Sequence, residues 1–262
     1  MAIYLDRILA AHRAAAGDDR RDIDALVAEA TAQPAARGFR AALRTSDSIA
    51  VISEIKRRSP SKGDLAPDLD PADLAARYTA GGAAALSVLT DVEFFGGSVA
   101  DLCAARAAVA VPVLRKDFTV GPADVLDARI MGADAVLLIA AALDPGELAE
   151  LYRLAVRVGL DALVEVHDES EAEVALAAGA TMIGVNQRDL TSFEVDTDRA
   201  RRVGAALPDH VVRVAESGIR DADDVRVLAD AGFDAILVGE TLVRSADPAA
   251  AVAGLSVTRS RA

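Results

Sequence analysis

The sequence predicts an α/β protein with the architecture of a (β/α)8 TIM barrel, preceded by a helical extension at the N-terminus. The first observation is a series of eight short aliphatic runs that alternate with alanine-rich helical patterns. The second is a glycine after most helical patterns and before the next run, where glycine supplies the left-handed cap that ends a helix. The third is size, because the eight units occupy residues 49–262, close to what one such barrel requires.

The expected strands are continuous apolar runs rather than alternating ones, which is typical of parallel strands covered on both faces. They are residues 49–52, 84–89, 111–114, 135–139, 162–166, 182–185, 211–215 and 235–238. The helical patterns between them are residues 71–79, 99–109, 123–131, 145–158, 169–178, 197–206 and 222–231. The junction glycines are Gly82, Gly132, Gly159, Gly179 and Gly232. A doubly wound open sheet is the alternative, but it favours a Gly-x-Gly-x-x-Gly loop after an early strand, and this sequence contains none.

Residues 1–48 form the expected N-terminal extension, which has helical patterns and no buried strand. Leu26 and Ala30, and then Phe39 and Leu43, recur at the spacing of one helix face. No linker or low-complexity tract separates this extension from residues 49–262. We therefore expect one domain overall, with the extension packed onto the barrel.

The composition excludes several classes of partner. The formal net charge is −13, which disfavours nucleic acid and anionic membranes, because both need basic surfaces. Cys103 is the only cysteine, so no disulfide can form within the chain. Asp6 and Arg7 interrupt the N-terminus, and no secretory signal is expected there. The three histidines are scattered without metal-ligand spacing. We expect a soluble cytoplasmic protein, and we favour a monomer.

Lysine is rare in this chain, and two of its lysines follow strands. Of 28 lysine and arginine residues, only Lys56, Lys62 and Lys116 are lysines. Arginine stays charged at any working pH, whereas a partly buried lysine can exchange its proton. Lys56 and Lys116 come just after the first and third expected strands, at the end of a barrel where active sites are built.

Side chains two positions apart on a strand share a face. Each charged residue near a strand end therefore shares a face with an earlier aliphatic residue: Glu54 and Lys56 with Ile52, Lys116 with Leu114, and Glu165 with Leu163. If the aliphatic residues point into the barrel, the two lysines and two carboxylates converge on its mouth. They would then serve catalysis or, as the alternative, form structural salt bridges. By the same parity, His167 is expected at the rim.

A phosphate site is expected after the last two strands, where barrels often bind phosphate next to a short extra helix. Ser217, Gly218 and Gly239 stand at these two places, and residues 240–244 have the length of the short helix. Glycine lets backbone N–H groups approach an anion. Glu240 would have to turn its carboxylate away and offer only its N–H. The alternative is that the glycines only form turns.

Aromatic residues near the mouth have two interpretations each. Phe94 and Phe95, followed by two glycines, could form a lid or a turn with buried rings. Phe118, beside Lys116, could form the wall of a pocket for an aromatic substrate or belong to the core. The pattern leaves both pairs of alternatives open.

Seven stretches, in order along the barrel, resemble the indole-3-glycerol-phosphate synthase family of tryptophan biosynthesis. They are EIKRRSPS (54–61), FGGS (95–98), VLRKDF (113–118), LVEVH (163–167), IGVNQRDL (183–190), AESGI (215–219) and LVGE (237–240). The helical extension is also similar to that of the family. Gln187 departs from the pattern, since many relatives carry Asn or Ala there. We expect it to point away from the mouth with little effect on activity.

The resemblance implies a carbon–carbon lyase that acts on 1-(2-carboxyphenylamino)-1-deoxyribulose 5-phosphate. It implies ring closure with loss of carbon dioxide and water, without cofactor or metal. By this resemblance Lys116 is the general acid for the ketone oxygen, and Glu165 transfers protons in ring closure and dehydration. Lys56 binds substrate anions and is a candidate second acid. The resemblance also assigns supporting roles: orientation of these groups to Glu54 and Asn186, substrate binding to Ser59, Phe95, Phe118 and Arg188, and phosphate binding to Ser217, Gly218, Gly239 and the Glu240 N–H.

Three other functions fit a barrel of this kind. A Schiff-base aldolase would use Lys116 or Lys56 as its nucleophile. An isomerase such as phosphoribosylanthranilate isomerase would use a Cys/Asp pair, but Cys103 lies within a helical pattern. A phosphate-binding barrel without activity would have no need for Lys116 and Glu165 together.

Overall fold

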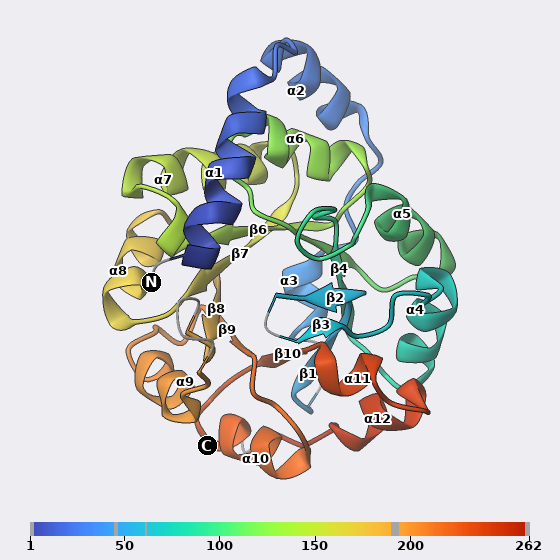
Figure 1. The fold of residues 1–262 in the computed structure, drawn as a ribbon. Helices are drawn as coiled ribbons and strands as arrows, with labels where there is room; N and C mark the ends of the chain where they lie inside the picture. The colour runs from blue at the N-terminus through green and yellow to red at the C-terminus, as the bar shows by residue number, and fades with distance from the viewer. Residues whose placement is uncertain (1–2, 45–46, 61, 190–193, 260–262) are drawn as a thin grey trace.

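The computed structural model describes residues 3–44, 47–60, 62–189 and 194–259. Eight parallel strands close into a barrel in the order β1-β10-β9-β8-β7-β6-β5-β4 (Figure 1), which confirms the predicted fold class. The strands are β1 (Ala50–Ile55), β4 (Ala85–Leu89), β5 (Val113–Lys116), β6 (Ala135–Ile139), β7 (Asp161–Val166), β8 (Met182–Asn186), β9 (Val212–Glu216) and β10 (Ala235–Val238). Ser61 and Leu190, which end two of the stretches quoted above, lie outside the described residues.

Each of the eight predicted runs forms a strand, but four strands extend further toward the mouth than the runs do. The added residues include Glu54 in β1, Lys116 in β5, Asn186 in β8 and Glu216 in β9. An apolar run ends where polarity begins, whereas a barrel strand continues as long as its inward polar side chains meet a cavity. The polar groups therefore lie on the rigid frame and not in loops.

Helices surround the barrel, as Figure 1 shows in a view along its axis. They are α4 (Pro71–Ala80), α5 (Val99–Ala108), α6 (Pro122–Ile130), α7 (Pro145–Arg157), α8 (Glu169–Ala177), α9 (Thr197–Gly204), α10 (Ala222–Asp230) and α12 (Pro248–Gly254), with the short α11 (Glu240–Val243) and the 3-10 turn η1 (Ala140–Ala142). Many begin at an aspartate whose carboxylate accepts a backbone N–H of the first turn, as Asp70 and Asp221 do. The five junction glycines all have positive φ, as the helix-cap interpretation requires.

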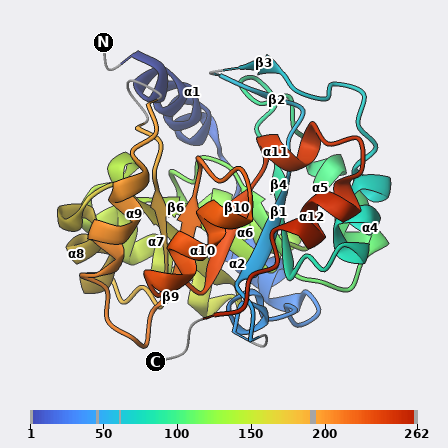
Figure 2. The same ribbon diagram turned by 90° about the horizontal axis from the view of Figure 1, so that it is seen from below.

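The N-terminal extension reaches both ends of the barrel. α1 (Ile3–Asp18) lies at the same end as a small hairpin of β2 (Arg58–Ser59) and β3 (Gly63–Asp64), which the sequence did not reveal (Figure 2). α2 (Ile23–Ala32) packs against α6 on the outside. α3 (Phe39–Ala42) lies near the barrel axis in Figure 1, and its Arg40 N–H donates to Asp161 at the start of β7, at the other end of the barrel from the mouth.

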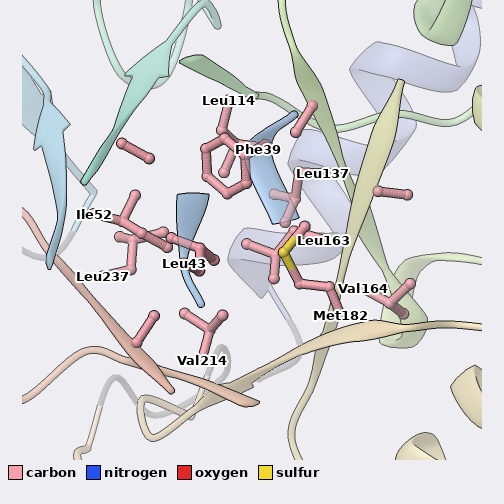
Figure 3. Packing of buried hydrophobic residues seen from close by; sticks show 14 of the residues in the cluster. Phe39, Leu43, Ile52, Leu114, Leu137, Leu163, Val164, Met182, Val214 and Leu237 are labelled. Carbon is pink, nitrogen blue, oxygen red and sulfur yellow. The ribbon is translucent and has the colours of Figure 1, made fainter. Parts of the chain in front are cut away.

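The barrel interior is aliphatic below the mouth. Figure 3 shows labelled side chains from seven of the strands meeting there: Ile52, Leu114, Leu137, Leu163, Met182, Val214 and Leu237. Phe39 and Leu43, both fully buried, lie in the same cluster, so the extension shares the core of the barrel. The inward direction assumed for Ile52, Leu114 and Leu163 is therefore correct. Among the described helices, none is long and apolar enough to cross a membrane.

Candidate active site

A cavity of about 970 Å³ opens at the end of the barrel where the strands finish. All thirteen residues that the sequence analysis assigned to the site line it: Glu54, Lys56, Ser59, Phe95, Lys116, Phe118, Glu165, Asn186, Arg188, Ser217, Gly218, Gly239 and Glu240. They come from strands and loops far apart in the sequence. One cavity therefore contains acid–base groups, aromatic rings and the two glycine-containing turns.

Lys116 lies at the centre of the charged groups. Its Nζ donates to Glu165 Oε2 at 2.7 Å and to Glu216 Oε2 at 3.1 Å. Burial by itself would lower the pKa of Lys116, but the charges of Glu165, Glu216 and Glu54 outweigh it and raise the pKa above its ordinary value. Lys116 is therefore an ammonium group at any working pH.

Glu165 is held on both carboxylate oxygens. Lys116 contacts Oε2, and Asn186 Nδ2 donates to Oε1 at 3.0 Å. The Asn186 amide is oriented in turn, because its Oδ1 accepts the backbone N–H of Arg188 at 3.0 Å. Burial disfavours the charged form of Glu165, but Lys116 and His167 more than offset it, so the pKa is lowered to about 2. Glu165 is an ionised base fixed in one orientation.

Glu216 is the principal site residue that the sequence analysis left out, although it lies within a stretch quoted for the family resemblance. Burial, added to the charges of Glu165 and Glu54, raises its pKa to about 8 in spite of Lys116. Its Oε1 is buried and has no hydrogen-bond partner among the described residues. Strand parity could have identified it, since Glu216 shares a face with Val214, which points into the barrel. It is the neutral carboxyl of the cluster near neutral pH.

Gly184 makes room for this carboxyl. A Cβ at position 184 would lie 2.1 Å from Glu216 Oε1, a distance that real contacts do not reach. Gly184 precedes Asn186 by two positions on β8, so it faces the interior. The glycine is therefore required for space and not for a special backbone angle.

Glu54 and Lys56 form a second charged pair on β1 and just beyond it. Lys56 Nζ donates to Glu54 Oε1, and Ser87 Oγ donates to Glu54 Oε2 at 3.5 Å. Gly239 closes over the same carboxylate, since a Cβ there would lie 2.5 Å from Glu54 Oε1. Glu54 thus links the lysines to the glycine-containing turn after β10.

The aromatic wall consists of Phe95 and Phe118, whose ring centroids are 6.1 Å apart. Phe118 lines the cavity and also packs against the hydrophobic core. Phe94, in contrast, is buried, and its ring meets Tyr4 of α1 edge-on at 6.0 Å. Of the adjacent pair, Phe95 faces the cavity and Phe94 is a packing residue.

α1 is fastened to this wall through His12. His12 Nε2 lies 3.0 Å from Asp91 Oδ2 and 3.9 Å from Asp117 Oδ1. Its ring stacks at an angle on Phe118, with centroids 5.5 Å apart. These three residues could surround a cation. However, Asp91 Oδ1 already accepts two backbone N–H groups and Asp117 is paired with Arg115, so the contacts describe an ion pair.

The opposite wall has the backbone geometry expected of an anion site. Ser217 and Gly218 both have positive φ, 68° and 75° respectively, and Gly239 is the N-cap of α11. The Glu240 carboxylate pairs with Arg244 at 3.7 Å, and Arg244 lines the cavity as well. Arg244 was not predicted, although a cation at the end of the short helix was a usable signal.

One further expectation is confirmed and another is wrong. Gln187 does not line the cavity, as predicted, but its Nε2 donates to Ser217 O at 2.7 Å and so supports the turn after β9. His167 was expected at the rim, yet only 12% of its side chain is exposed, and its Nε2 lies 3.7 Å from Glu165 Oε1. Parity places a side chain on a face of the strand, but at the strand end the chain turns and brings the ring back.

Comparison with known proteins agrees with this geometry. The family model described as "Indole-3-glycerol phosphate synthase" matches residues 5–255. A protein of that name from Mycobacterium ulcerans is 51% identical over 256 residues, covering 97% of this chain and 94% of its own. Another, from Streptomyces griseus, is 51% identical over 253 residues, with 96% and 94% covered. These matches confirm the resemblance inferred from the seven stretches.

Solved structures of low identity share the fold alone. A thiamine phosphate pyrophosphorylase from Pyrococcus furiosus has a TM-score of 0.61 at 19% identity, covering 79% of this chain and 93% of its own. An N-acetylmannosamine-6-phosphate 2-epimerase from Clostridium perfringens has a TM-score of 0.59 at 14% identity, with 75% and 88% covered.

Proposed function

Because the chain belongs to the indole-3-glycerol phosphate synthase family, we propose that it is a carboxy-lyase of tryptophan biosynthesis. Its substrate is 1-(2-carboxyphenylamino)-1-deoxyribulose 5-phosphate, and its products are indole-3-glycerol phosphate, carbon dioxide and water. The observation that carries the proposal is Lys116, held as an ammonium between Glu165 and Glu216 at the base of the cavity. An acid and a base in contact at one place suit a reaction that protonates a ketone and later removes a ring proton.

Lys116 supplies the first proton. The ring carbon that bears the carboxylate attacks the ketone carbon, and the ketone oxygen becomes an alkoxide as the bond forms. An alkoxide is a far stronger base than an amine, so an ammonium with a raised pKa still transfers its proton. The carboxylate then leaves as carbon dioxide, and its electron pair restores the aromatic ring.

Glu165 and a second acid complete the dehydration. Glu165, ionised by its contacts with Lys116 and Asn186, removes a proton from the ring methylene carbon. The hydroxyl leaves as water after it receives a proton, for which Lys56 and Glu216 are the available donors in the cavity. The double bond that forms completes the indole.

The remaining lining residues hold the substrate. The turns at Ser217, Gly218 and Gly239, with the Glu240 N–H and Arg244, bind the phosphate at one wall. Phe95 and Phe118 face the aromatic ring at the other wall. Ser59 and Arg188 line the same cavity and bind the carboxylate. Binding energy from the phosphate thus acts far from the reacting carbons.

Schiff-base chemistry is the second candidate, and the charge state of Lys116 disfavours it. A nucleophilic lysine must be neutral, whereas three carboxylates raise the pKa of Lys116. The isomerase alternative lacks its thiol, because Cys103 lies exposed on α5.

The test is to give the purified protein the carboxyphenylamino-deoxyribulose phosphate and follow indole fluorescence. We expect a product that fluoresces as an indole, together with release of one carbon dioxide. Borohydride added during turnover should leave the protein unlabelled. Folded protein that forms no indole, or a lysine labelled by borohydride, would refute the proposal.

A further inference from the structure

His167 occupies a position between Glu165 and the protein surface. Its Nδ1 lies 3.1 Å from Glu171 Oε2, and its Nε2 lies 3.7 Å from Glu165 Oε1. This Nε2 is buried and has no hydrogen-bond partner among the described residues. The Glu171 side chain is 23% exposed, against 3% for Glu165. The three groups form a line from near the solvent to the base of the cavity.

The junction between β7 and α8 creates this line. Asp168 is the N-cap of α8, and its carboxylate accepts the Glu171 N–H at 2.8 Å. Glu171, one turn into the helix, then accepts both the backbone N–H of His167 at 2.7 Å and its ring Nδ1. The imidazole is therefore held in one orientation, with Nε2 directed at Glu165. A packing histidine would need no such support.

The proposed reaction takes up a proton from solvent in each turnover. One proton goes to the ketone oxygen and one to the leaving hydroxyl, and only one returns when the ring methylene loses its proton. The carboxylate leaves as neutral carbon dioxide, so the balance is one proton consumed. Bound substrate would lie between the mouth and the pair of Glu165 and Lys116, so a second route to water would let this proton enter during turnover.

We propose that His167 is this route, a proton relay that carries protons from Glu171 at the surface to Glu165. Glu171 takes a proton from water and passes it to Nδ1, and Nε2 delivers the opposite ring proton to Glu165. Glu165 in turn passes a proton across its 2.7 Å contact to Lys116, which has given its own proton to the ketone oxygen. A small rotation of the ring or the carboxylate brings the 3.7 Å separation to hydrogen-bond length. His167 touches no substrate; it acts through Glu165. This role rests on the proposed function.

The charges around His167 support a protonated ring. The groups that face it are Glu165 on β7, Glu171 on α8 and Arg199 on α9. Burial and the positive charge of Arg199 lower the pKa of His167. The hydrogen bond to Glu171 and the charge of Glu165 raise the pKa by a larger amount. The net effect is a pKa above the ordinary value. His167 therefore keeps its ring proton to higher pH than an ordinary histidine and loses it as the pH rises further.

The test compares the pH dependence of kcat in wild type and His167→Gln at saturating substrate. Near pH 6.5 we expect kcat of the variant to fall about 10-fold or more, as for loss of an acid–base group, with KM little changed. At high pH the wild-type ring is neutral, so the two rates should converge. In His167→Ala, added imidazole should restore turnover. In Glu171→Gln the alkaline limb should move to lower pH.

Glu173→Gln is the matched control, because Glu173 is exposed on the same helix as Glu171 and should leave both kcat and its pH profile unchanged. His167→Gln with the wild-type pH profile would overturn the relay while leaving the proposed function intact. If the wild-type protein makes no indole, both the relay and the proposed function would be wrong.

A second measurement does not need turnover. Imidazole NMR should show that the His167 pKa falls in Glu165→Gln relative to wild type. An unchanged pKa would mean that the two side chains do not interact, and the relay would be wrong. Circular dichroism of each variant identifies loss of fold.

Discussion

Around Lys116, at the base of the cavity, carboxyl groups outnumber lysines, and this imbalance determines which groups in the cluster carry protons. Glu54, Glu165 and Glu216 all act on its ammonium, and burial makes every remaining negative charge costly. The cluster relieves this by keeping one proton on Glu216, whose pKa is raised to about 8, while Glu165 stays ionised. One buried site therefore contains both an acid and a base near neutral pH, which is what the proposed dehydration needs.

Lys116→Met tests the acid directly. The substitution keeps the unbranched side chain up to the position of Cε and removes the ammonium group, so we expect kcat to fall by about 10²–10⁴-fold. Substrate binding should be retained, because the phosphate turns and aromatic wall are elsewhere in the cavity. Turnover by fluorescence and affinity by calorimetry separate the two effects.

Lys62→Met, which removes an exposed lysine at the rim, is the control. Near-normal turnover in Lys116→Met would exclude the general-acid role.

Glu216→Gln tests the protonated carboxyl through stability. A group whose folded pKa is raised stabilises the protein below its unfolded pKa of about 4.5 and loses this effect as pH rises through about 8. The neutral amide avoids the burial of a charge at high pH. We therefore expect the melting temperature of Glu216→Gln, relative to wild type, to rise between pH 6 and pH 9. A difference independent of pH would show that Glu216 is already ionised in the folded state. Activity should fall even where stability improves.

Single residues were predictable from the sequence where strand parity applied. Lys116 and Glu165 follow buried aliphatic residues by two positions, and both line the cavity in the structure, as strand parity predicts. Asn186 and Arg188 had no such argument and were assigned through the family resemblance. The contacts of His167 and Gln187 could not be predicted, because both depend on how the chain turns after the strand ends. Local pattern carries no information about that turn.

One of the contacts between helix α1 and the mouth is made by a histidine. The hydrogen bond of His12 to Asp91 outweighs its burial and, with the charge of Asp117, raises the His12 pKa. This contribution to stability is present below the ordinary pKa of 6.5 and is lost as pH rises through the raised folded value. The ring also contacts Phe118, so release of α1 would loosen one wall of the cavity.

His12→Asn should weaken α1 at low pH more than at high pH. We expect faster amide hydrogen exchange across residues 3–18 at pH 6, with the difference from wild type shrinking by pH 8.5. Mass spectrometry of peptic fragments measures it. The matched control is His210→Asn, since His210 is an exposed histidine between α9 and β9, far from α1 in the sequence. Equal exchange in His12→Asn and wild type at pH 6 would show that α1 docks without this ion pair.

The turn after β10 depends on the absence of a side chain at Gly239. An alanine there would meet Glu54 Oε1 at 2.5 Å, so either the carboxylate or the turn must move. We expect Gly239→Ala to raise KM and weaken inhibition by inorganic phosphate. Gly146→Ala is the control, because a Cβ at that position has open space around it. Unchanged phosphate inhibition in Gly239→Ala would place the anion elsewhere.

At the scale of the molecule, the barrel was predictable because each unit repeats the same signals. A continuous apolar run recurs eight times, with a helical pattern after most runs and a glycine cap at five junctions, so an error at one boundary does not change the number of strands. The β2–β3 hairpin was missed because it consists of polar residues and is supported from outside itself, as where the Arg58 N–H donates to Phe95 O. The path of the extension could not be predicted either, since helical periodicity shows that one face of a helix is buried but not which residues it packs against.

That path gives the extension a share in the stability of the whole barrel. Phe39 of α3 is fully buried in the cluster that contains Leu114, Leu137 and Leu163 from three strands (Figure 3). α3 lies at the end of the barrel where the strands begin, since its Arg40 N–H donates to Asp161 at the start of β7. We expect Phe39→Ala to lower the free energy of unfolding by about 3–5 kcal/mol, the usual effect of removing a buried ring, measured by urea denaturation. Val227→Ala, at a side chain that is 61% exposed on α10, should change it by less than about 0.5 kcal/mol. Because the cavity lies at the other end, folded Phe39→Ala should retain its kcat. An unchanged urea midpoint would mean that the barrel core closes without α3, and residues 1–48 would then be an appendage instead of part of one folding unit.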